Sequence, residues 1–304
     1  LVMMKHELTR LFGCQTAILT LTLFLLGTNL WMYATGNPVM SHTYSFFLFA
    51  WFMRLTRRWY ESPSNALSMA LGLVAGLIVL VRTNNVLFLL FFPAYDIRSI
   101  RDIPLRLATW QTHVGRLGIL LVSALLAFLP QLILWKATTG HMVVYSYGQE
   151  SFQLTSPKIF QVLFSLRCGI LFWSPVLALS LVGVAFTRKQ APAYFLPLLV
   201  YLPLQVYLVS AWWDPAWGGG FPHRAFIESY ALLLFPTASL LKVAHSTPMR
   251  RVVILYALLA VSWTLFLMKL SYTYEIGIWG LDRSALFDLF WSRWHALKSG
   301  IRVW

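Results

Sequence analysis

The sequence predicts an all-α protein whose helices form a polytopic transmembrane bundle. The 304 residues are 59% hydrophobic and 11% charged, and a water-soluble domain carries about twice that charged fraction. The mean hydropathy is +0.67, and apolar stretches close to the ~20 residues of a membrane span recur along the chain. Because lipid cannot hydrogen-bond to exposed backbone groups, we expect each stretch to be helical.

About nine segments are expected as helices, some of them short or broken. They cover 12–33, 41–55, 66–81, 85–95, 114–135, 169–187, 193–211, 225–241 and 252–270. The first is too long for a signal-peptide core and lacks a clear cleavage site, so we expect it to be retained. The segment 85–95 extends ~16 Å as a helix, about half of the ~30 Å hydrocarbon core. Residues 1–270 are thus predicted to form one transmembrane domain.

The tail 271–304 is predicted to form an amphipathic helix that lies in the membrane interface. Its apolar stripe at helical spacing consists of Leu286, Phe287, Phe290, Trp291, Trp294 and Leu297. Arg283, Arg293 and Lys298 occupy polar positions of the same stretch.

The distribution of basic residues predicts a cytoplasmic N-terminus. The net charge of +14 is explained by basic cytoplasmic loops and anionic lipid rather than by nucleic acid. With the N-terminus inside, the inner loops hold the basic residues within 54–58, 98–116, 188–189 and 242–251. The orientation after residue 95 depends on the short segment 85–95 returning to the cytoplasm.

This topology places four polar segments on one outer face, at 34–42, 82–85, 137–168 and 212–224. The last is the most crowded, with three tryptophans, three glycines, a carboxylate, a histidine and an arginine. Gly218 to Gly220 permit a close approach of the main chain to a ligand. Trp213 and its neighbouring tryptophans can stack on a sugar or anchor a helix end at the headgroups. Asp214 can act as a general base, as a partner for Arg224 or as a cap.

Two groups of residues are candidates for phosphate binding. Arg82 with Asn84 lies where one half-span ends and another begins, so a fixed cation and a helix N-terminus meet there. Alternatively, Arg82 extends to the interface and asparagine caps the next helix. Arg224 and His223 directly precede a helix, where a guanidinium is well placed to meet phosphate oxygens.

Other polar residues complete the candidate site. His42 begins the second span, either as a ligand contact or as a packed or capping residue. Tyr147 and Glu150 lie in the loop 137–168, in which Ser156 and Pro157 predict a helix start. Arg82 and Glu228 are the charges that fall within apolar spans, where charge is costly and informative. No metal or cofactor motif is found, so we expect neither, and a divalent metal is not indicated.

Three stretches, 31–47, 70–85 and 212–224, together resemble the GT-C class of integral-membrane glycosyltransferases. The first contains the core from Pro38 to Phe47, and the second ends in Val81-Arg82-Thr83-Asn84-Asn85. The protein mannosyltransferase and aminoarabinose transferase families belong to this class, which takes sugars from polyprenyl-phosphate donors outside the cytoplasm. The resemblance implies a bacterial inner-membrane protein whose partners are a polyprenyl-phosphate-linked sugar, membrane lipids and an acceptor of unknown identity.

The resemblance also implies a mechanism. An acidic side chain deprotonates the acceptor hydroxyl, which displaces the lipid phosphate while cations stabilise the departing phosphate. Arg82 and Arg224 are the candidate cations, and Asp214 and Glu150 are the candidate bases. In this class the acid normally lies in the first external loop, yet the turn 34–42 contains none. Either an N-terminal helix and loop precede Leu1, or the activity is altered or lost.

Two other classes of function are compatible with this sequence. A transporter or lipid flippase also has broken half-spans in a basic polytopic chain, although the absence of internal repeats and of polar residues at mid-depth speaks against it. A non-catalytic subunit of a membrane assembly is favoured by the missing acid.

Overall fold

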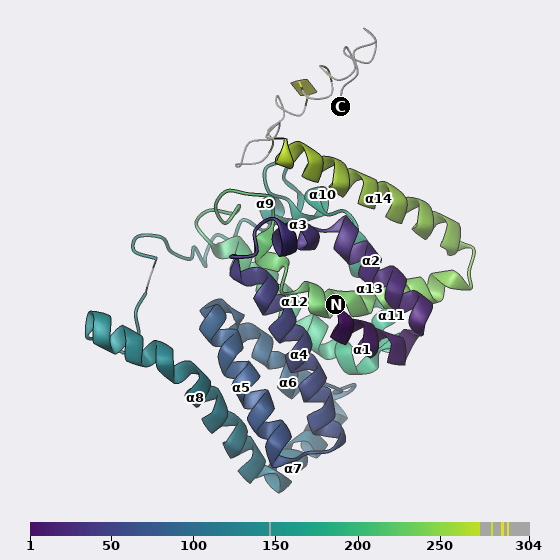
Figure 1. Ribbon diagram of the computed structural model, residues 1–304. Helices are drawn as coiled ribbons and strands as arrows, with labels where there is room; N and C mark the ends of the chain where they lie inside the picture. The colour runs from purple at the N-terminus through teal and green to yellow at the C-terminus, as the bar shows by residue number, and fades with distance from the viewer. Residues whose placement is uncertain (146, 274–280, 282–286, 289–290, 292–304) are drawn as a thin grey trace.

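The computed structural model describes residues 1–145, 147–273, 281, 287–288 and 291. In this part of the chain, fourteen α-helices and three short 3-10 helices are present and no β-strand is found (Figure 1). The predicted all-α class is confirmed for these residues. The predicted interfacial helix within 271–304 lies almost entirely outside them.

Among the described helices, three are long and apolar enough to cross a membrane. They are α8 (Val114–Thr139), α12 (Pro192–Ala211) and α14 (Met249–Tyr272). The shorter apolar helices are α2 (Cys14–Gly27), α5 (Asn65–Val81), α13 (Tyr230–His245) and the stretch Thr83–Ala94. The transmembrane character is therefore supported by three spans, and the larger number of nine stays a prediction.

The first predicted segment, 12–33, is not one continuous helix. It is divided among α1 (Val2–Phe12), α2 and α3 (Leu30–Thr35). Gly13, between α1 and α2, has a φ of 88°, in the left-handed region that ends helices. Thr28 has extended backbone, and its hydroxyl donates to the carbonyl of Phe24 at 2.5 Å. These two breaks explain why the apolar run does not form a single span.

Most other predicted segments coincide with helices, several of them interrupted. The helix α4 (Ser41–Glu61) begins where predicted. The short segment 85–95 is the 3-10 helix η1 (Thr83–Leu90) followed by α6 (Phe91–Ala94). The segment 169–187 is split into α10 (Ile170–Trp173) and α11 (Leu177–Gln190). The segment 225–241 is split into η3 (Arg224–Phe226) and α13.

Three further elements lie in the predicted loops. The 3-10 helix η2 (Ile100–Asp102) leads into α7 (Ile103–Thr112). The helix α9 (Ile159–Phe164) has Lys158 as its N-cap residue. The predicted helix start at Ser156 and Pro157 is therefore wrong by a few residues.

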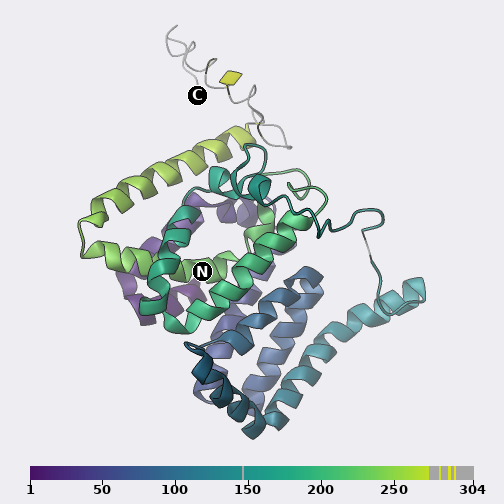
Figure 2. The same ribbon diagram turned by 180° about the vertical axis from the view of Figure 1, so that it is seen from behind.

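Close packing of α5 against α8 depends on two glycines one helical turn apart. A β-carbon on Gly72 would lie 2.2 Å from the carbonyl oxygen of Leu120, and one on Gly76 would lie 2.3 Å from that of Ala124. This Gly-x-x-x-Gly spacing lets two helix backbones approach closely in a membrane. Beyond this contact, α8 diverges from α5 toward the edge of the molecule (Figures 1 and 2).

The basic residues assigned to the first inner loop belong to α4 and pair with α1. Nε of Arg57 lies 2.8 Å from a carboxylate oxygen of Glu7, and Nη1 of Arg54 lies 3.1 Å from the other. Glu7 is buried, so its charge needs these partners. This ion cluster fixes the end of α4 that is remote from His42.

The four segments predicted to share one face do come together. The start of α4, the end of α5, the loop 141–158 and the loop 212–229 gather at one end of the bundle, and α7 lies at the other (Figures 1 and 2). The side of the membrane on which this end lies stays a prediction.

Candidate functional site

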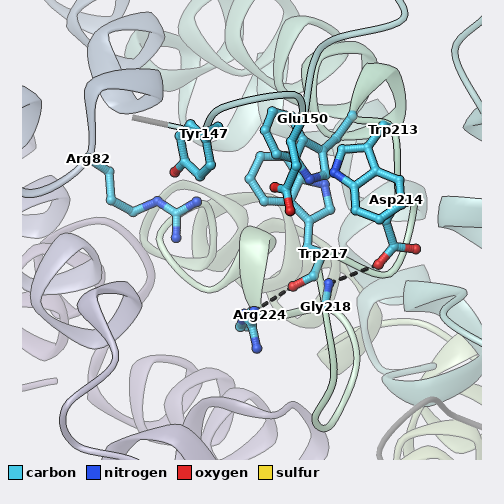
Figure 3. Close-up of a pocket in the computed structure, with 9 residues that line it drawn as sticks. Arg82, Tyr147, Glu150, Trp213, Asp214, Trp217, Gly218 and Arg224 are labelled. Atoms are coloured by element: carbon cyan, nitrogen blue, oxygen red, sulfur yellow. Dashed lines mark hydrogen bonds between the residues drawn. The ribbon is translucent and has the colours of Figure 1, made fainter. Parts of the chain in front are cut away.

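A cavity of about 480 Å³ lies among these segments (Figure 3). It is lined by Arg82, Tyr147, Glu150, Trp212, Trp213, Asp214, Trp217, Gly218 and Arg224. Its size is within the range of pockets that hold small molecules. Its lining combines cations, carboxylates and aromatic rings.

Six of the predicted site residues line the cavity: Arg82, Tyr147, Glu150, Trp213, Asp214 and Arg224. Three predicted residues, His42, Asn84 and His223, are not part of its lining. The other three residues of the lining, Trp212, Trp217 and Gly218, belong to the loop 212–224, for which sugar stacking by the tryptophans and close main-chain approach at the glycines were predicted.

The aromatic wall is built around Trp212. Its ring stacks on that of Trp217 with centroids 5.2 Å apart, and Tyr147 meets it edge-on at 5.0 Å. Phe152 packs against Trp212 at 4.8 Å from outside the lining. Because Trp212 is buried, it shapes the wall, whereas Trp213 keeps 44% of its surface exposed and is free to contact a ligand or lipid headgroups.

Backbone hydrogen bonds hold the loop that carries Glu150. The amide of Trp213 donates to the carbonyl of Ser151 at 3.2 Å, and the amide of Gln153 donates to that of Ala211 at 2.6 Å. Glu150 directly precedes this anchored stretch. Within the described residues, its side-chain carboxylate has no hydrogen bond or ion pair, so it is available to a ligand.

Asp214 is occupied by its own loop and by Arg167. Its Oδ1 lies 3.1 Å from Nη2 of Arg167, and its carboxylate accepts from the amides of Ala216 at 3.2 Å and Gly218 at 3.0 Å. Of the alternatives for Asp214, capping within the loop is confirmed, and pairing with Arg224 is wrong. The reason is that the carboxylate pairs instead with Arg167, in the segment before α10.

The loop wraps its main chain around Arg224. Nη1 donates to the carbonyl of Gly219 at 2.7 Å, and Nη2 donates to that of Trp217. Gly218 and Gly220 have φ values of 78° and 115°, which side chains rarely permit. Arg224 is bound by carbonyls, and no carboxylate of the described residues forms an ion pair with it, so its charge is uncompensated in the cavity wall.

Arg82 reaches the same cavity from the end of α5. Its Cζ lies 5.7 Å from the centroid of the Trp217 ring, close enough for a cation–π interaction. Its Nη1 lies 2.8 Å from Nε2 of His42. In Figure 3 the guanidinium of Arg82 and the carboxylate of Glu150 project toward the same space.

Behind Arg82 lies a buried pair, His42 and Glu228. Nδ1 of His42 is 3.0 Å from Oε2 of Glu228, and the two side chains are 2% and 1% exposed. Oε1 of Glu228 also lies 3.9 Å from Nε of Arg82. Glu228 was not predicted as a site residue, and its only sequence signal was a charge within an apolar stretch.

His223 and Asn84 lie outside the cavity lining. His223 is fully buried, packs edge-on against Phe226, and has no partner for either ring nitrogen within the described residues. Burial lowers the pKa of the His223 imidazole to about 3, so this side chain is neutral at pH 7 and adds no positive charge for a phosphate. Beside Asn84, the side-chain Nδ2 of Asn85 donates to the hydroxyl of Ser45 at 3.0 Å.

In the described part of the chain, no group of three or more histidine, cysteine, aspartate or glutamate residues is placed to hold a metal ion. Comparisons with protein-family models, with curated proteins and with solved structures found no match. The geometry of the cavity is therefore the basis for assigning a function.

Proposed function

We propose that this chain is a membrane glycosyltransferase-like protein that transfers a sugar from a polyprenyl-phosphate donor to an acceptor hydroxyl. The reaction would occur on the extracytoplasmic face of a bacterial inner membrane. One observation carries the proposal: the guanidinium groups of Arg82 and Arg224 and the carboxylate of Glu150 line a single cavity with an aromatic wall.

The two guanidinium groups are the basis for phosphate recognition. A guanidinium presents several N–H donors in a plane that matches phosphate oxygens. Arg224 contributes the larger net charge, because no carboxylate of the described residues pairs with it and two carbonyls accept from it, whereas Arg82 lies 3.9 Å from the carboxylate of Glu228. Both cations are held by the protein before a ligand binds.

The aromatic wall supports binding of the sugar. Tyr147 and the exposed Trp213 belong to the lining, and aromatic faces pack against the apolar faces of sugar rings. The cavity of about 480 Å³ has room for a monosaccharide with its phosphate, and the polyprenyl chain would remain in the surrounding lipid.

Glu150 is the proposed general base. Its carboxylate would take the proton of the acceptor hydroxyl as that oxygen attacks the anomeric carbon. The bond from the anomeric carbon to the phosphate oxygen breaks, and its electron pair stays on the phosphate, where Arg82 and Arg224 stabilise the charge. Asp214 is the weaker candidate because Arg167 and two loop amides occupy its carboxylate.

Proteoliposomes with the wild-type chain and single variants test this function. A panel of undecaprenyl-phosphate monosaccharides, labelled in the sugar, is supplied together with membrane-derived acceptors. Arg82→Ala and Arg224→Ala are expected to abolish transfer while the proteins still fold. The matched control is Arg188→Ala, which removes an exposed arginine from the last turn of α11 and should leave transfer unchanged. Unchanged transfer in both cavity variants would contradict the proposed site.

A further inference from the structure

We propose that His42 and Glu228 are positioning residues that hold the guanidinium of Arg82 in the orientation that binds the donor phosphate. Neither residue lines the cavity, so both act through Arg82. This inference rests on the proposed function, because it assumes that Arg82 contacts the phosphate.

The hydrogen-bond chain has one consistent arrangement of protons. The carboxylate of Glu228 only accepts hydrogen bonds, so Nδ1 of His42, 3.0 Å away, must carry the proton. In the neutral ring Nε2 then has a lone pair. Nη1 of Arg82 lies 2.8 Å from Nε2 and 3.2 Å from Nδ1, so the nearer nitrogen is the one that can accept. Glu228 therefore selects the tautomer that binds Arg82.

Three separate segments supply this chain of contacts. His42 is the second residue of α4, Arg82 follows the last residue of α5, and Glu228 lies between η3 and α13. The contacts connect the start of α4 and the end of α5 to the segment that follows the loop 212–224. Arg82 is the member of the three that lines the cavity, so contacts made outside the lining set the position of a lining residue.

Two neighbours restrain the guanidinium of Arg82. His42 binds the Nη1 atom, and the ring of Trp217 lies 5.7 Å from Cζ. A free arginine side chain loses considerable rotamer freedom when it binds a ligand, and prior ordering removes much of that cost. The N–H groups that His42 does not use remain available to phosphate oxygens.

Two neutral substitutions of His42 separate positioning from simple packing. In His42→Gln the side-chain amide extends to about the position of Nε2 and can still accept from Arg82. In His42→Asn the amide extends only to about the position of Nδ1, which lies 3.2 Å from Nη1 of Arg82, so the shorter contact at Nε2 is lost. Neither variant changes the charge of the site. A merely structural role would give both variants similar binding.

The probe is undecaprenyl phosphate without a sugar, titrated against the full chain in nanodiscs with binding measured by native mass spectrometry. We expect His42→Asn to weaken binding about tenfold or more, as for loss of a hydrogen bond to a charged group, and His42→Gln to remain close to wild type. Arg82→Ala should weaken binding at least as much as His42→Asn. If His42→Asn does not fold, the test is whether His42→Gln retains binding.

The matched control uses a second histidine that contacts an arginine. Nδ1 of His113 lies 2.8 Å from Nη1 of Arg116, between α7 and α8 at the other end of the bundle. His113→Asn and His113→Gln should both bind undecaprenyl phosphate as the wild type does.

The possible failures are distinguishable. Suppose that Arg82→Ala loses binding. If folded His42→Gln also loses binding, or if His42→Asn binds like the wild type, the positioning role is wrong and the proposed function stands. If the wild-type chain does not bind undecaprenyl phosphate, or Arg82→Ala binds equally well, the proposed phosphate site is wrong and this inference with it.

Discussion

The carboxylate of Asp214 lies 3.1 Å from the guanidinium of Arg167 and forms no ion pair with Arg224 among the described residues. The charged residues of the cavity are thus of two kinds, those paired with an opposite charge and those without such a partner. Asp214 serves the structure of the loop, whereas Arg224 and Glu150 have no oppositely charged partner among the described residues. The uncompensated pair is where we expect the chemistry.

Glu150→Gln should remove the general base and leave phosphate recognition intact. We expect transfer of the labelled sugar to fall by about a hundredfold or more, with binding of undecaprenyl phosphate unchanged. Asp214→Asn is the matched variant, because it neutralises the other carboxylate of the lining. Greater loss of transfer in Asp214→Asn than in Glu150→Gln would assign the base to Asp214 instead.

Asp214→Asn should mainly loosen the loop. An asparagine keeps one acceptor oxygen but loses the charge that strengthens the bonds from Ala216 and Gly218, at a cost of about 1–2 kcal/mol. The ion pair itself adds little, because Arg167 is 46% exposed. Limited proteolysis of 212–224 and thermal denaturation measure the effect. Cleavage at the wild-type rate would show that these bonds do not hold the loop.

Gly76→Ala should destabilise the packing of α5 on α8. The added β-carbon would lie 2.3 Å from the carbonyl oxygen of Ala124, so the helices must separate, at a cost of about 1–3 kcal/mol. Gly118→Ala in α8 is the control, since a β-carbon there meets no atom of the described structure within 4 Å and alanine favours helix. The free energy of unfolding in detergent should fall for Gly76→Ala alone.

His223 should make the fold sensitive to acid. Burial lowers the pKa of its imidazole to about 3 from the ordinary value of 6.5. Below pH 6.5 the unfolded chain binds a proton at His223 and the folded chain does not, so the free energy of unfolding falls as the pH drops from 6.5 toward 3. The slope approaches about 1.4 kcal/mol per pH unit, and well above pH 6.5 this contribution is constant.

The variant His223→Phe isolates this contribution to acid sensitivity. The difference in unfolding free energy between wild type and variant, followed from pH 7.5 to 4.5, should change below pH 6.5 only. A constant difference over the whole range would mean that His223 titrates normally in the folded protein.

Much of this fold follows from the length and spacing of apolar runs. The start of α4, the bounds of α5 and the broken segment before Tyr95 are visible in the sequence, because lipid requires helices and a short apolar run cannot span it. The interruptions at Gly13 and at 174–176 were missed. A single glycine or proline in an apolar run is compatible with a continuous helix, and only the surrounding packing decides between a kink and a break.

The sequence predicted which residues line the candidate site better than it predicted which side chains contact one another. Charge bias placed the loops of Arg82, Glu150 and Arg224 on one face, and they line one cavity. The partners of Asp214 and His42 were not predictable, because Arg167 and Glu228 are distant in sequence and only the helix packing brings them close. The buried charge of Glu228 was the one usable signal.

The stereochemistry of transfer tests the central claim most directly. A single displacement of the phosphate by the acceptor oxygen attacks the anomeric carbon from the opposite face and inverts its configuration. Wild-type proteoliposomes are supplied with undecaprenyl-phosphate monosaccharides of defined anomeric configuration, and the glycosylated product is analysed by nuclear magnetic resonance. We predict a product of inverted configuration whose formation is lost in Arg224→Ala. A product of retained configuration, or no transfer from any donor of the panel, would contradict the account.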